Sequence, residues 1–234
     1  SKPKRWVHSE PWPQRVAHEL NNPLMGIINY SQYCLSKTDK EDKRFQLLED
    51  VETEAKRCMD IVNNLLTFSR QDRQEGKEER KLVNCSKIID RVLKLMAYRI
   101  DKKEIKIQKE YNPSDLPNVL VKEHEVQQVF LNLISNAIDA VIDSKQKEIE
   151  FKMEEKGEFL NIRITDTGMG ISEEVIESIF EPFFTTKPTD KGTGLGLSIS
   201  HSIVKSHGGS LHCESKPGEG ASFEFSLPIA KNSA

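Results

Sequence analysis

The sequence of 234 residues has few of the features that mark a disulfide-rich or metal-clustered protein. Its four cysteines lie far apart and none forms a C-x-x-C pair, which argues against a structural zinc site or a dithiol redox centre. Cys34 and Cys58 fall on apolar faces of predicted helices, so we expect both side chains to be buried. Because nothing in the sequence requires an oxidising compartment, we expect a cytoplasmic location.

Long hydrophobic runs and a strong charge of one sign are also missing. No apolar run approaches the ~20 residues that cross a bilayer, so we expect this chain itself to make no membrane contact. Membrane anchoring of a longer protein would have to come from segments outside it. The 34 Lys and Arg residues nearly balance the 37 Asp and Glu residues, giving a net charge of −3. Without a basic field, we expect no nucleic-acid partner.

Two long amphipathic helices are predicted in the first third of the chain. Apolar residues recur at helical spacing from Val16 to Leu35 and again from Phe45 to Leu66, with a polar turn at 38–42 between them. Two such helices form an antiparallel hairpin, and a lone hairpin cannot bury both apolar stripes. We therefore predict a homodimer whose two hairpins form a four-helix bundle. The alternative is that the hairpin packs on the rest of its own chain.

Changes in composition divide the chain into four segments. Residues 1–13 form a proline-punctuated N-terminal segment, and residues 14–74 form the helical domain. Residues 75–81 are charged, contain a glycine and show no apolar periodicity, which is typical of a linker. Residues 82–230 form the second domain.

The second domain mixes helices and strands. Alternating apolar residues predict strands at 81–84, 105–111, 119–121, 148–155, 159–166, 211–215 and 222–227. Helical spacing predicts helices at 86–101, 123–142, 172–179 and 197–207. One sheet with several helices on one face gives an α+β sandwich. The fold class is thus a helical hairpin followed by an α+β sandwich.

The first helix carries a histidine with an adjacent carboxylate, His18 and Glu19. Asn22 follows one turn later, on the same helix face as His18. Pro23 comes next, although an interior proline costs a helix ~3 kcal/mol. By itself this segment fits either a functional histidine or a surface helix with an incidental histidine and a kink.

Two clusters in the second domain present polar groups, one along a predicted helix and one at the end of a predicted strand. Asn132, Asn136 and Asp139 form a polar ridge on the helix at 123–142, and uncharged oxygens suit Mg²⁺ when phosphates supply the remaining ligands. Asp166 ends a predicted strand and could accept a proton from an amine. Gly168 and Gly170 follow it and would let the backbone approach a flat ligand.

Two further clusters flank a glycine-rich loop. Phe180-Glu-Pro-Phe183-Phe-Thr-Thr-Lys187 precedes the loop, and Gly192-Thr193-Gly194-Leu195-Gly196 opens the following helix. Glycines just before a helix N-terminus expose backbone N–H groups, which suit an anion such as a triphosphate. Each cluster alone is a weak signal, but four in this order are a strong one.

With these motifs, the chain closely resembles the core of bacterial two-component sensor histidine kinases over nearly its whole length. His18-Glu-Leu-Asn-Asn22-Pro-Leu resembles their histidine box, and Asn132 to Asp139 their asparagine box. Asp166 to Gly170 and Gly192 to Gly196 resemble the two glycine boxes, and Phe180 to Phe183 the phenylalanine box. The resemblance implies an ATP-binding domain of the histidine kinase, gyrase and chaperone type.

The resemblance also implies residue roles. His18 would be the phosphoacceptor, Glu19 its general base, and Asn22 the residue that orients water during dephosphorylation of a partner. Asn136 would bind Mg²⁺ with Asn132 nearby, and Asp166 would bind the adenine amino group in a pocket shaped by Gly168 and Gly170. The other residues implied in ATP binding are Asp139, Phe183, Lys187, Gly192, Thr193, Gly194, Leu195 and Gly196.

The implied activity is ATP-dependent phosphorylation of His18 and transfer to an aspartate of a response-regulator receiver domain. The related gyrase and chaperone ATPases place a glutamate base where Asn132 stands, and an amide cannot take a proton from water. Two alternatives stay open. One is a protein that mainly dephosphorylates the regulator through Asn22, and the other is a non-enzymatic dimeric scaffold with a degenerate nucleotide pocket.

Overall fold

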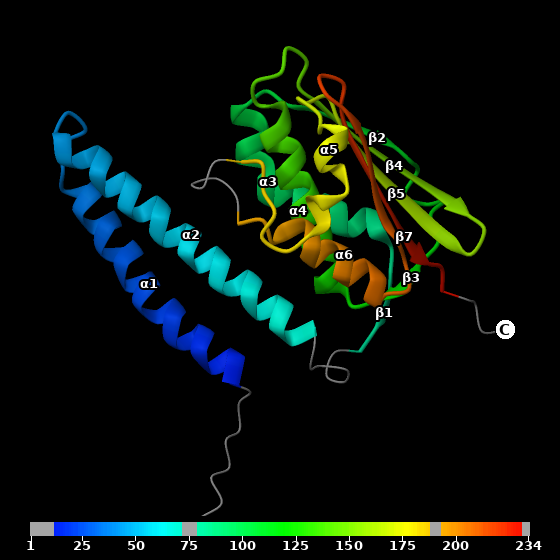
Figure 1. The fold of residues 1–234 in the computed structure, drawn as a ribbon, viewed down its shortest axis with the longest axis horizontal. Coiled ribbons are helices and arrows are strands. Elements are labelled where there is room, and N and C mark those ends of the chain that lie inside the picture. Colours follow the sequence, from blue (N-terminus) through cyan, green and yellow to red (C-terminus); the bar gives the residue numbers. More distant parts are fainter. Residues whose placement is uncertain (1–11, 72–78, 188–192, 231–234) are drawn as a thin grey trace, which may run out of the picture. The chain divides into compact units, whose positions relative to one another are not determined.

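The computed structural model describes residues 12–71, 79–187 and 193–230. In the first helical region, side chains are described for residues 20–56 and for Cys58, Met59 and Val62. The chain divides into two compact units, Ser1–Glu75 and Gly76–Ala234. Figure 1 shows a helical unit and a mixed α/β unit.

The first unit is a hairpin of two long helices, α1 (Trp12–Ser36) and α2 (Lys43–Gln71). Pro13 lies in the first turn of α1, where its missing N–H is not needed. Pro23 lies inside α1, and the helix continues through it to Ser36. The backbone N–H of Arg44 donates to Asp42 Oδ1 at 2.8 Å, so Asp42 caps the start of α2.

The two helices contact each other through a narrow apolar face. Ile28, Ser31 and Ala55 are buried, and Gln32 Nε2 donates to Glu52 Oε1 at 2.8 Å across the hairpin. Large apolar side chains remain exposed on other faces of the hairpin, namely Leu20, Met25, Ile27, Tyr30, Tyr33, Leu47 and Val51. A single hairpin therefore leaves a second apolar surface uncovered, as the predicted four-helix bundle requires.

The expectation that Cys34 and Cys58 are buried is wrong for this chain. Both thiols are exposed. The helical periodicity placed them on an apolar stripe, but that stripe is wider than the face that α1 and α2 share. Only part of it is covered by the partner helix.

Within residues 79–187 and 193–230, the second unit contains three long helices, two short helical turns and two sheets. The helices are α3 (Cys85–Lys102), α4 (Glu123–Val141), α5 (Glu173–Ile176), the 3₁₀ turn η1 (Ser178–Phe180) and α6 (Gly196–Ser206). The strands are β1 (Lys81–Val83), β2 (Lys106–Glu110), β3 (Val119–Val121), β4 (Glu148–Lys156), β5 (Phe159–Asp166), β6 (Leu211–Lys216) and β7 (Gly220–Pro228).

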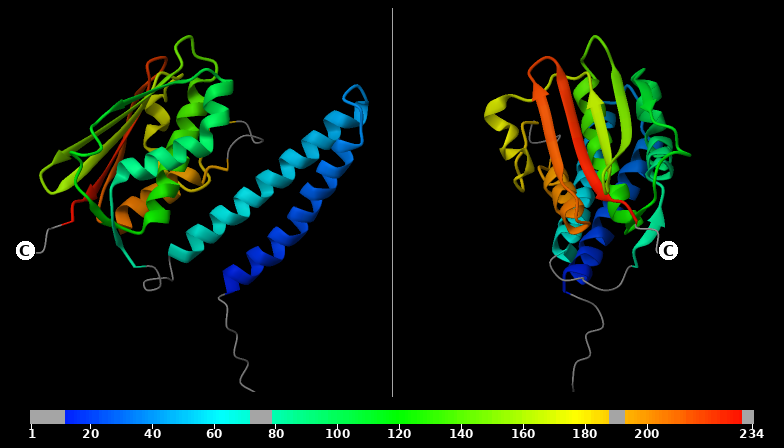
Figure 2. Two further views of the ribbon diagram at one scale, coloured as in Figure 1. Left: turned by 180° about the vertical axis from the view of Figure 1, so that it is seen from behind. Right: turned by 90° about the vertical axis from the view of Figure 1, so that its right-hand side faces the viewer.

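The main sheet has five strands in the order β2-β4-β5-β7-β6. β2 and β4 are parallel and the other neighbours are antiparallel, while β1 and β3 form a separate antiparallel pair. Both views in Figure 2 show α3, α4 and α6 on the same face of this sheet. The predicted α+β sandwich is confirmed.

The core lies between the sheet and these helices. Side chains of β5 alternate between buried and half-buried from Leu160 to Asp166, as expected for a sheet with one covered face. From α4, Val129, Phe130 and Leu133 point into the same layer and are almost fully buried. Phe130 packs edge-to-face on Phe225 of β7, with ring centroids 5.3 Å apart.

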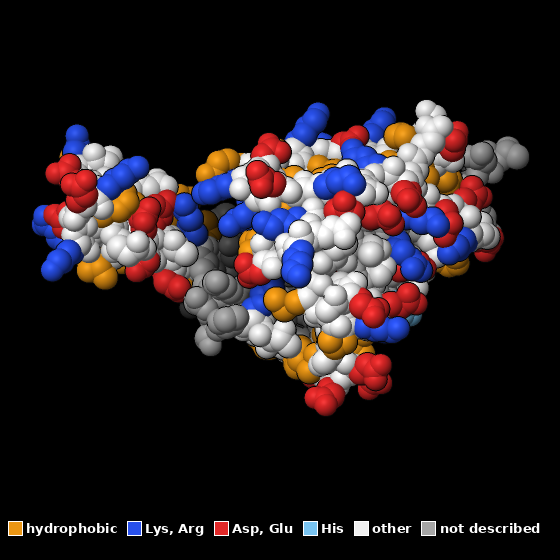
Figure 3. All heavy atoms as spheres, turned by 90° about the horizontal axis from the view of Figure 1, so that it is seen from above, with side chains coloured by type: hydrophobic (Ala, Val, Ile, Leu, Met, Phe, Trp, Pro, Cys, Tyr) orange, Lys and Arg blue, Asp and Glu red, His pale blue; other side chains and the backbone are white. Residues whose placement is uncertain are grey.

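Charged side chains of both signs form ion pairs on the second unit, such as Lys106 with Glu148. On the uncovered face of the sheet, Arg163 pairs with Glu224 at 2.6 Å. Figure 3 shows Lys and Arg side chains mixed with Asp and Glu over the face seen from above. Among the described residues, none of the helices is both long and apolar enough to span a membrane.

Replacing Phe130 by alanine should destabilise the second unit by ~3–5 kcal/mol, because it removes a fully buried ring and leaves a cavity. The free energy of unfolding in urea measures this loss. Phe159→Ala is the matched control, since Phe159 is 37% exposed at the start of β5 and should cost much less. Equal losses for the two variants would contradict the assignment of Phe130 to the core.

Candidate functional site

The polar ridge of α4 is positioned by the packing of the opposite helix face. Leu133, Ile134 and Ile138 are buried in the hydrophobic core. Asn132, Asn136 and Asp139 are half-buried, and helical spacing places them together along one side of α4. The sequence prediction that these three residues share a ridge is therefore consistent with the burial pattern.

Asn132 ties α4 to the beginning of α6. Its Nδ2 donates to the carbonyl oxygen of Gly196 at 3.0 Å and to Ser200 Oγ at 3.2 Å. The same Gly196 carbonyl accepts from Ser200 Oγ at 2.9 Å. Asn132 thus fixes the first turn of α6 beside the polar ridge.

A lysine from the segment before the glycine loop lies against the other two ridge residues. Lys187 Nζ lies 3.2 Å from Asn136 Oδ1 and 2.7 Å from Asp139 Oδ2. Asp139 Oδ1 in turn accepts from Arg99 Nη2 of α3 at 2.7 Å. Two side-chain oxygens of α4, Asn136 Oδ1 and Asp139 Oδ2, therefore contact a cationic group. Oxygen ligands of this kind suit a cation such as Mg²⁺.

Asp166 is a buried carboxylate at the end of β5. Its Oδ1 accepts the backbone N–H of Gly168 at 2.8 Å and that of Ala221 at 3.3 Å. Burial raises the pKa of Asp166, and these two hydrogen bonds work in the opposite direction. The carboxyl group is thereby fixed in place by backbone on two sides.

The glycines after Asp166 are required by close packing. A Cβ at Gly168 would lie 2.6 Å from Ala140 Cβ, and one at Gly170 would lie 2.0 Å from the Lys216 carbonyl oxygen. Gly170 also has φ of +71°, which favours glycine. These two positions let the loop lie against α4 and the turn between β6 and β7.

The Phe180–Lys187 segment is joined to the glycine loop by its backbone. Phe183 has φ of 67°, unusual for a residue other than glycine, and its N–H donates to the Gly194 carbonyl at 2.9 Å. A Cβ at Gly194 would lie 2.4 Å from the Phe183 carbonyl carbon. Thr193 Oγ1 accepts the N–H of Leu195, which is buried, and α6 begins at Gly196.

Some predicted site residues are only partly described. Gly192 lies outside the described residues. His18 and Glu19 belong to α1, but their side chains are outside the described part of the structure. Asn22 is an exposed residue of the same helix.

Arg99 belongs to the site, although no sequence pattern indicates it. It lies 40 residues before Asp139 on another helix, and its Nη1 also donates to Ser135 Oγ at 3.1 Å. No local pattern distinguishes it from other exposed basic residues of α3. Its proximity to the ridge depends on the packing of α3 against α4.

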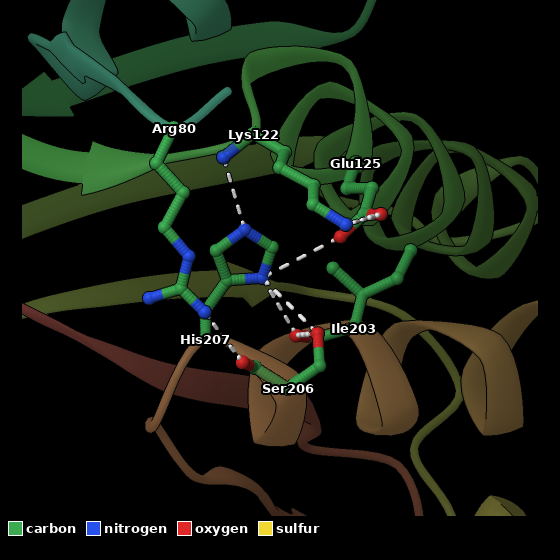
Figure 4. A network of polar contacts seen from close by, with 6 residues as sticks. All are labelled: Arg80, Lys122, Glu125, Ile203, Ser206 and His207. Carbon is green, nitrogen blue, oxygen red and sulfur yellow. Dashed lines mark hydrogen bonds and ion pairs between the residues drawn. The ribbon is translucent and has the colours of Figure 1, made fainter. Parts of the chain in front are cut away.

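His207, at the end of α6, is the centre of a buried polar network (Figure 4). Its Nε2 accepts the Lys122 backbone N–H at 3.1 Å, and its Nδ1 lies 2.9 Å from the Ile203 carbonyl oxygen. This arrangement fits a neutral ring that carries its proton on Nδ1, and burial lowers the pKa of His207. Arg80 donates to the Ser206 carbonyl at 3.0 Å. The network pins the end of α6 to the start of α4.

A shallow hollow of about 470 Å³ lies elsewhere in this unit, beside the start of β6. Residues that line it include Phe159, Asn161, Gly209, His212 and Glu224. None of the predicted site residues lines it. The chemistry of the side chains, and not the size of this hollow, therefore identifies the candidate site.

Replacing Gly194 by alanine should weaken ATP binding at least tenfold, because the new Cβ would collide with the Phe183 backbone and Gly194 has φ of +68°. Titration with a fluorescent ATP analogue measures the affinity. Gly157→Ala is the control: it has a similar φ of +62° and open space around it, in the β4–β5 turn. An equal loss of affinity in both variants would contradict a specific role of the Gly194–Phe183 contact, because the positive φ is the feature that the two glycines share.

Two family models match the chain. One, described as "His Kinase A (phospho-acceptor) domain", matches residues 14–74. The other, described as "Histidine kinase-, DNA gyrase B-, and HSP90-like ATPase", matches residues 121–231. The matches fall in the helical unit and the α/β unit, respectively.

The chain is 34% identical over 222 residues to the sensor protein FixL of Bradyrhizobium diazoefficiens, which covers 92% of this chain and 42% of FixL. It therefore spans less than half the length of that curated relative. The catalytic domain of histidine kinase ThkA is 34% identical, with a TM-score of 0.57, covering 64% of this chain and 96% of the ThkA domain.

A second ThkA structure, a complex with the response regulator protein TrrA, is 29% identical with a TM-score of 0.67. This match covers 94% of the present chain and 62% of that one. Together with the two family models, these similarities extend over both units. The chain belongs to the two-component sensor histidine kinases.

Proposed function

We propose that this chain is the kinase core that uses ATP to phosphorylate His18 and then passes the phosphoryl group to a response-regulator aspartate. The observation that carries the proposal is the use of Asn132. Its side-chain amide donates hydrogen bonds to Gly196 and Ser200 of α6. An amide is not a base, so this position has no group that could take a proton from an attacking water molecule. A site of this kind favours transfer of the phosphoryl group over hydrolysis.

The nucleotide would lie between α4, the Asp166 loop and the start of α6. Asp166 would accept a hydrogen bond from the adenine amino group, while Gly168 and Gly170 let the loop that carries Asp166 pack closely against α4 and the β6–β7 turn. The glycine-rich backbone from Thr193 to Gly196, including Gly194 and Leu195, would lie against the phosphates together with Lys187, and Phe183 would hold this loop. The approach of glycine-rich backbone and a helix N-terminus to phosphates supports this arrangement.

Asn136 would bind Mg²⁺, with Asp139 as its charged neighbour. When bound, Mg²⁺ would neutralise negative charge on the phosphates. The contact of Lys187 with both α4 oxygens supports a preference of this position for cations.

His18 would act as the nucleophile. A neutral imidazole nitrogen attacks the γ-phosphorus, a nitrogen–phosphorus bond forms, and the bond to the bridging oxygen breaks as ADP leaves. Glu19 accepts the proton from the other ring nitrogen, which keeps the attacking nitrogen electron-rich. The ordinary pKa of histidine, ~6.5, makes the neutral form available near neutral pH.

The partners follow from the two domains. We propose that residues 14–74 form a homodimeric four-helix bundle, because the hairpin leaves large apolar side chains uncovered. Residues 82–230 would be the catalytic domain, working in the cytoplasm. The receiver domain of a response regulator would accept the phosphoryl group, and the ThkA–TrrA complex supports such a partner.

Incubation with Mg²⁺ and γ-labelled ATP should place an acid-labile label on the wild-type chain and none on His18→Gln. The label should be acid-labile because a phosphoramidate bond hydrolyses in acid. Asp166→Asn should bind ATP poorly and label weakly. Equal labelling of wild type and His18→Gln would refute the proposal, and a wild-type chain that does not bind ATP would favour the scaffold alternative.

A second activity, dephosphorylation of the regulator, is favoured by the position of Asn22. This residue is exposed on α1, one helical turn after His18. Asn22→Ala should slow loss of phosphate from a phosphorylated receiver domain about tenfold or more while sparing labelling of His18. Exposed Asn29, two turns further along α1, is the control for an asparagine lost from this helix.

A further inference from the structure

The ion pairs around Asp139 place two cations on one carboxylate. Arg99 Nη2 lies 2.7 Å from Oδ1, and Lys187 Nζ lies 2.7 Å from Oδ2. Arg99 is also held to α4 through Ser135 Oγ, so its guanidinium contacts two residues one turn apart. Asp139 is thus braced from α3 on one side and bound to Lys187 on the other.

Lys187 makes a second contact that Arg99 does not make. Its ammonium lies 3.2 Å from Asn136 Oδ1, the oxygen that we propose as the metal ligand. The ammonium group therefore lies between an amide oxygen and a carboxylate oxygen of α4. A metal ion using these oxygens and an ammonium group in the same place would repel each other strongly, so the two cannot occupy it together.

We propose that Lys187 is a built-in counter-cation of this site, which holds the position between Asn136 and Asp139 in the nucleotide-free protein and leaves it when Mg²⁺ and nucleotide bind. Lys187 then exchanges the Asp139 carboxylate for phosphate oxygens. Arg99 stays on Asp139 in both states and keeps the carboxylate from being left without a partner. This inference rests on the proposed function, since it takes Mg²⁺ and ATP as the ligands.

The exposure of the pair makes such an exchange feasible. Both side chains are about one-third exposed, at 34% each, so water screens their attraction and the contact can break without a large penalty. A fully buried pair would instead leave an uncompensated charge on opening. Lys187 also stays paired with a negative charge throughout the exchange, because it moves from the Asp139 carboxylate to the phosphate oxygens.

The consequence is a coupling between residues 187 and 139 that exists only before the nucleotide binds. In the wild type, binding must break the Lys187–Asp139 contact, which offsets part of what Lys187 gains on the phosphates. With Asp139→Asn this contact is lost beforehand, so Lys187 contributes its full phosphate interaction. Lys187→Met should therefore weaken binding about two- to fivefold more in the Asp139→Asn background than in the wild type.

Calorimetric titration of the full chain with a non-hydrolysable ATP analogue and Mg²⁺ measures this double-mutant cycle. Arg99→Met serves as the matched control. The Arg99–Asp139 contact is present both before and after nucleotide binding, so it does not contribute to the affinity. The effect of Arg99→Met on affinity should therefore be the same with and without Asp139→Asn. Circular dichroism checks that each variant is folded.

An equal effect of Lys187→Met in the two backgrounds would overturn the inference, since it would mean that the Lys187–Asp139 contact either persists in the complex or is absent before binding. That result leaves the proposed kinase function intact if the wild type binds the analogue. A wild-type chain that binds no analogue would instead remove the proposed function and this inference with it.

Discussion

The packing of α4 against the sheet is the constraint on which the second unit depends. Phe130, Leu133 and Ile134 fill the layer between helix and sheet. Because a helix turns every 3.6 residues, burying these side chains forces Asn132 and Asn136 to another side of the same helix. The core and the polar ridge are therefore two faces of one element. A substitution on the ridge changes the site without opening a cavity in the core.

Backbone rather than side chains shapes most of the candidate nucleotide site. Gly168 and Gly170 lie where a Cβ has no room, and the buried Asp166 carboxylate is held by two backbone N–H groups. Its pKa is raised above that of the unfolded chain, so the ionised carboxylate lowers stability at neutral pH. The free energy of unfolding contributed by this group therefore increases as the pH falls through its folded pKa, and the gain is complete below the ordinary value of 3.8. Such a carboxylate is ready to accept a hydrogen bond from a ligand.

The two ends of α6 are fixed by different means. Asn132 holds its first turn, and His207 joins its last turn to the start of α4. Because α6 is fixed at both ends, the C-terminal end of the glycine loop, where α6 begins at Gly196, is held in place. Lys187 adds a positive charge that Asn136 and Asp139 of α4 hold beside this loop. Helices fixed in this way and an exposed cation beside them fit the proposed nucleotide site.

The sequence by itself determined the elements, the order of the motifs and the family, because periodicity, glycine positions and turn chemistry act over short distances. It predicted α4 and β5 to within a residue, and it placed Asn132, Asn136 and Asp139 on one ridge. The roles of His18 and Asn22 stay predictions, since their chemistry depends on partners.

Only the tertiary structure decided which distant residues meet. The parallel pairing of β2 with β4, the contact of Arg99 with Asp139, and the position of Lys187 join segments about 40 or more residues apart. It also showed Cys34 and Cys58 to be exposed, because the hairpin covers less of its apolar stripe than helical periodicity suggests. Local patterns specify which face of an element is apolar, but long-range packing determines what covers it.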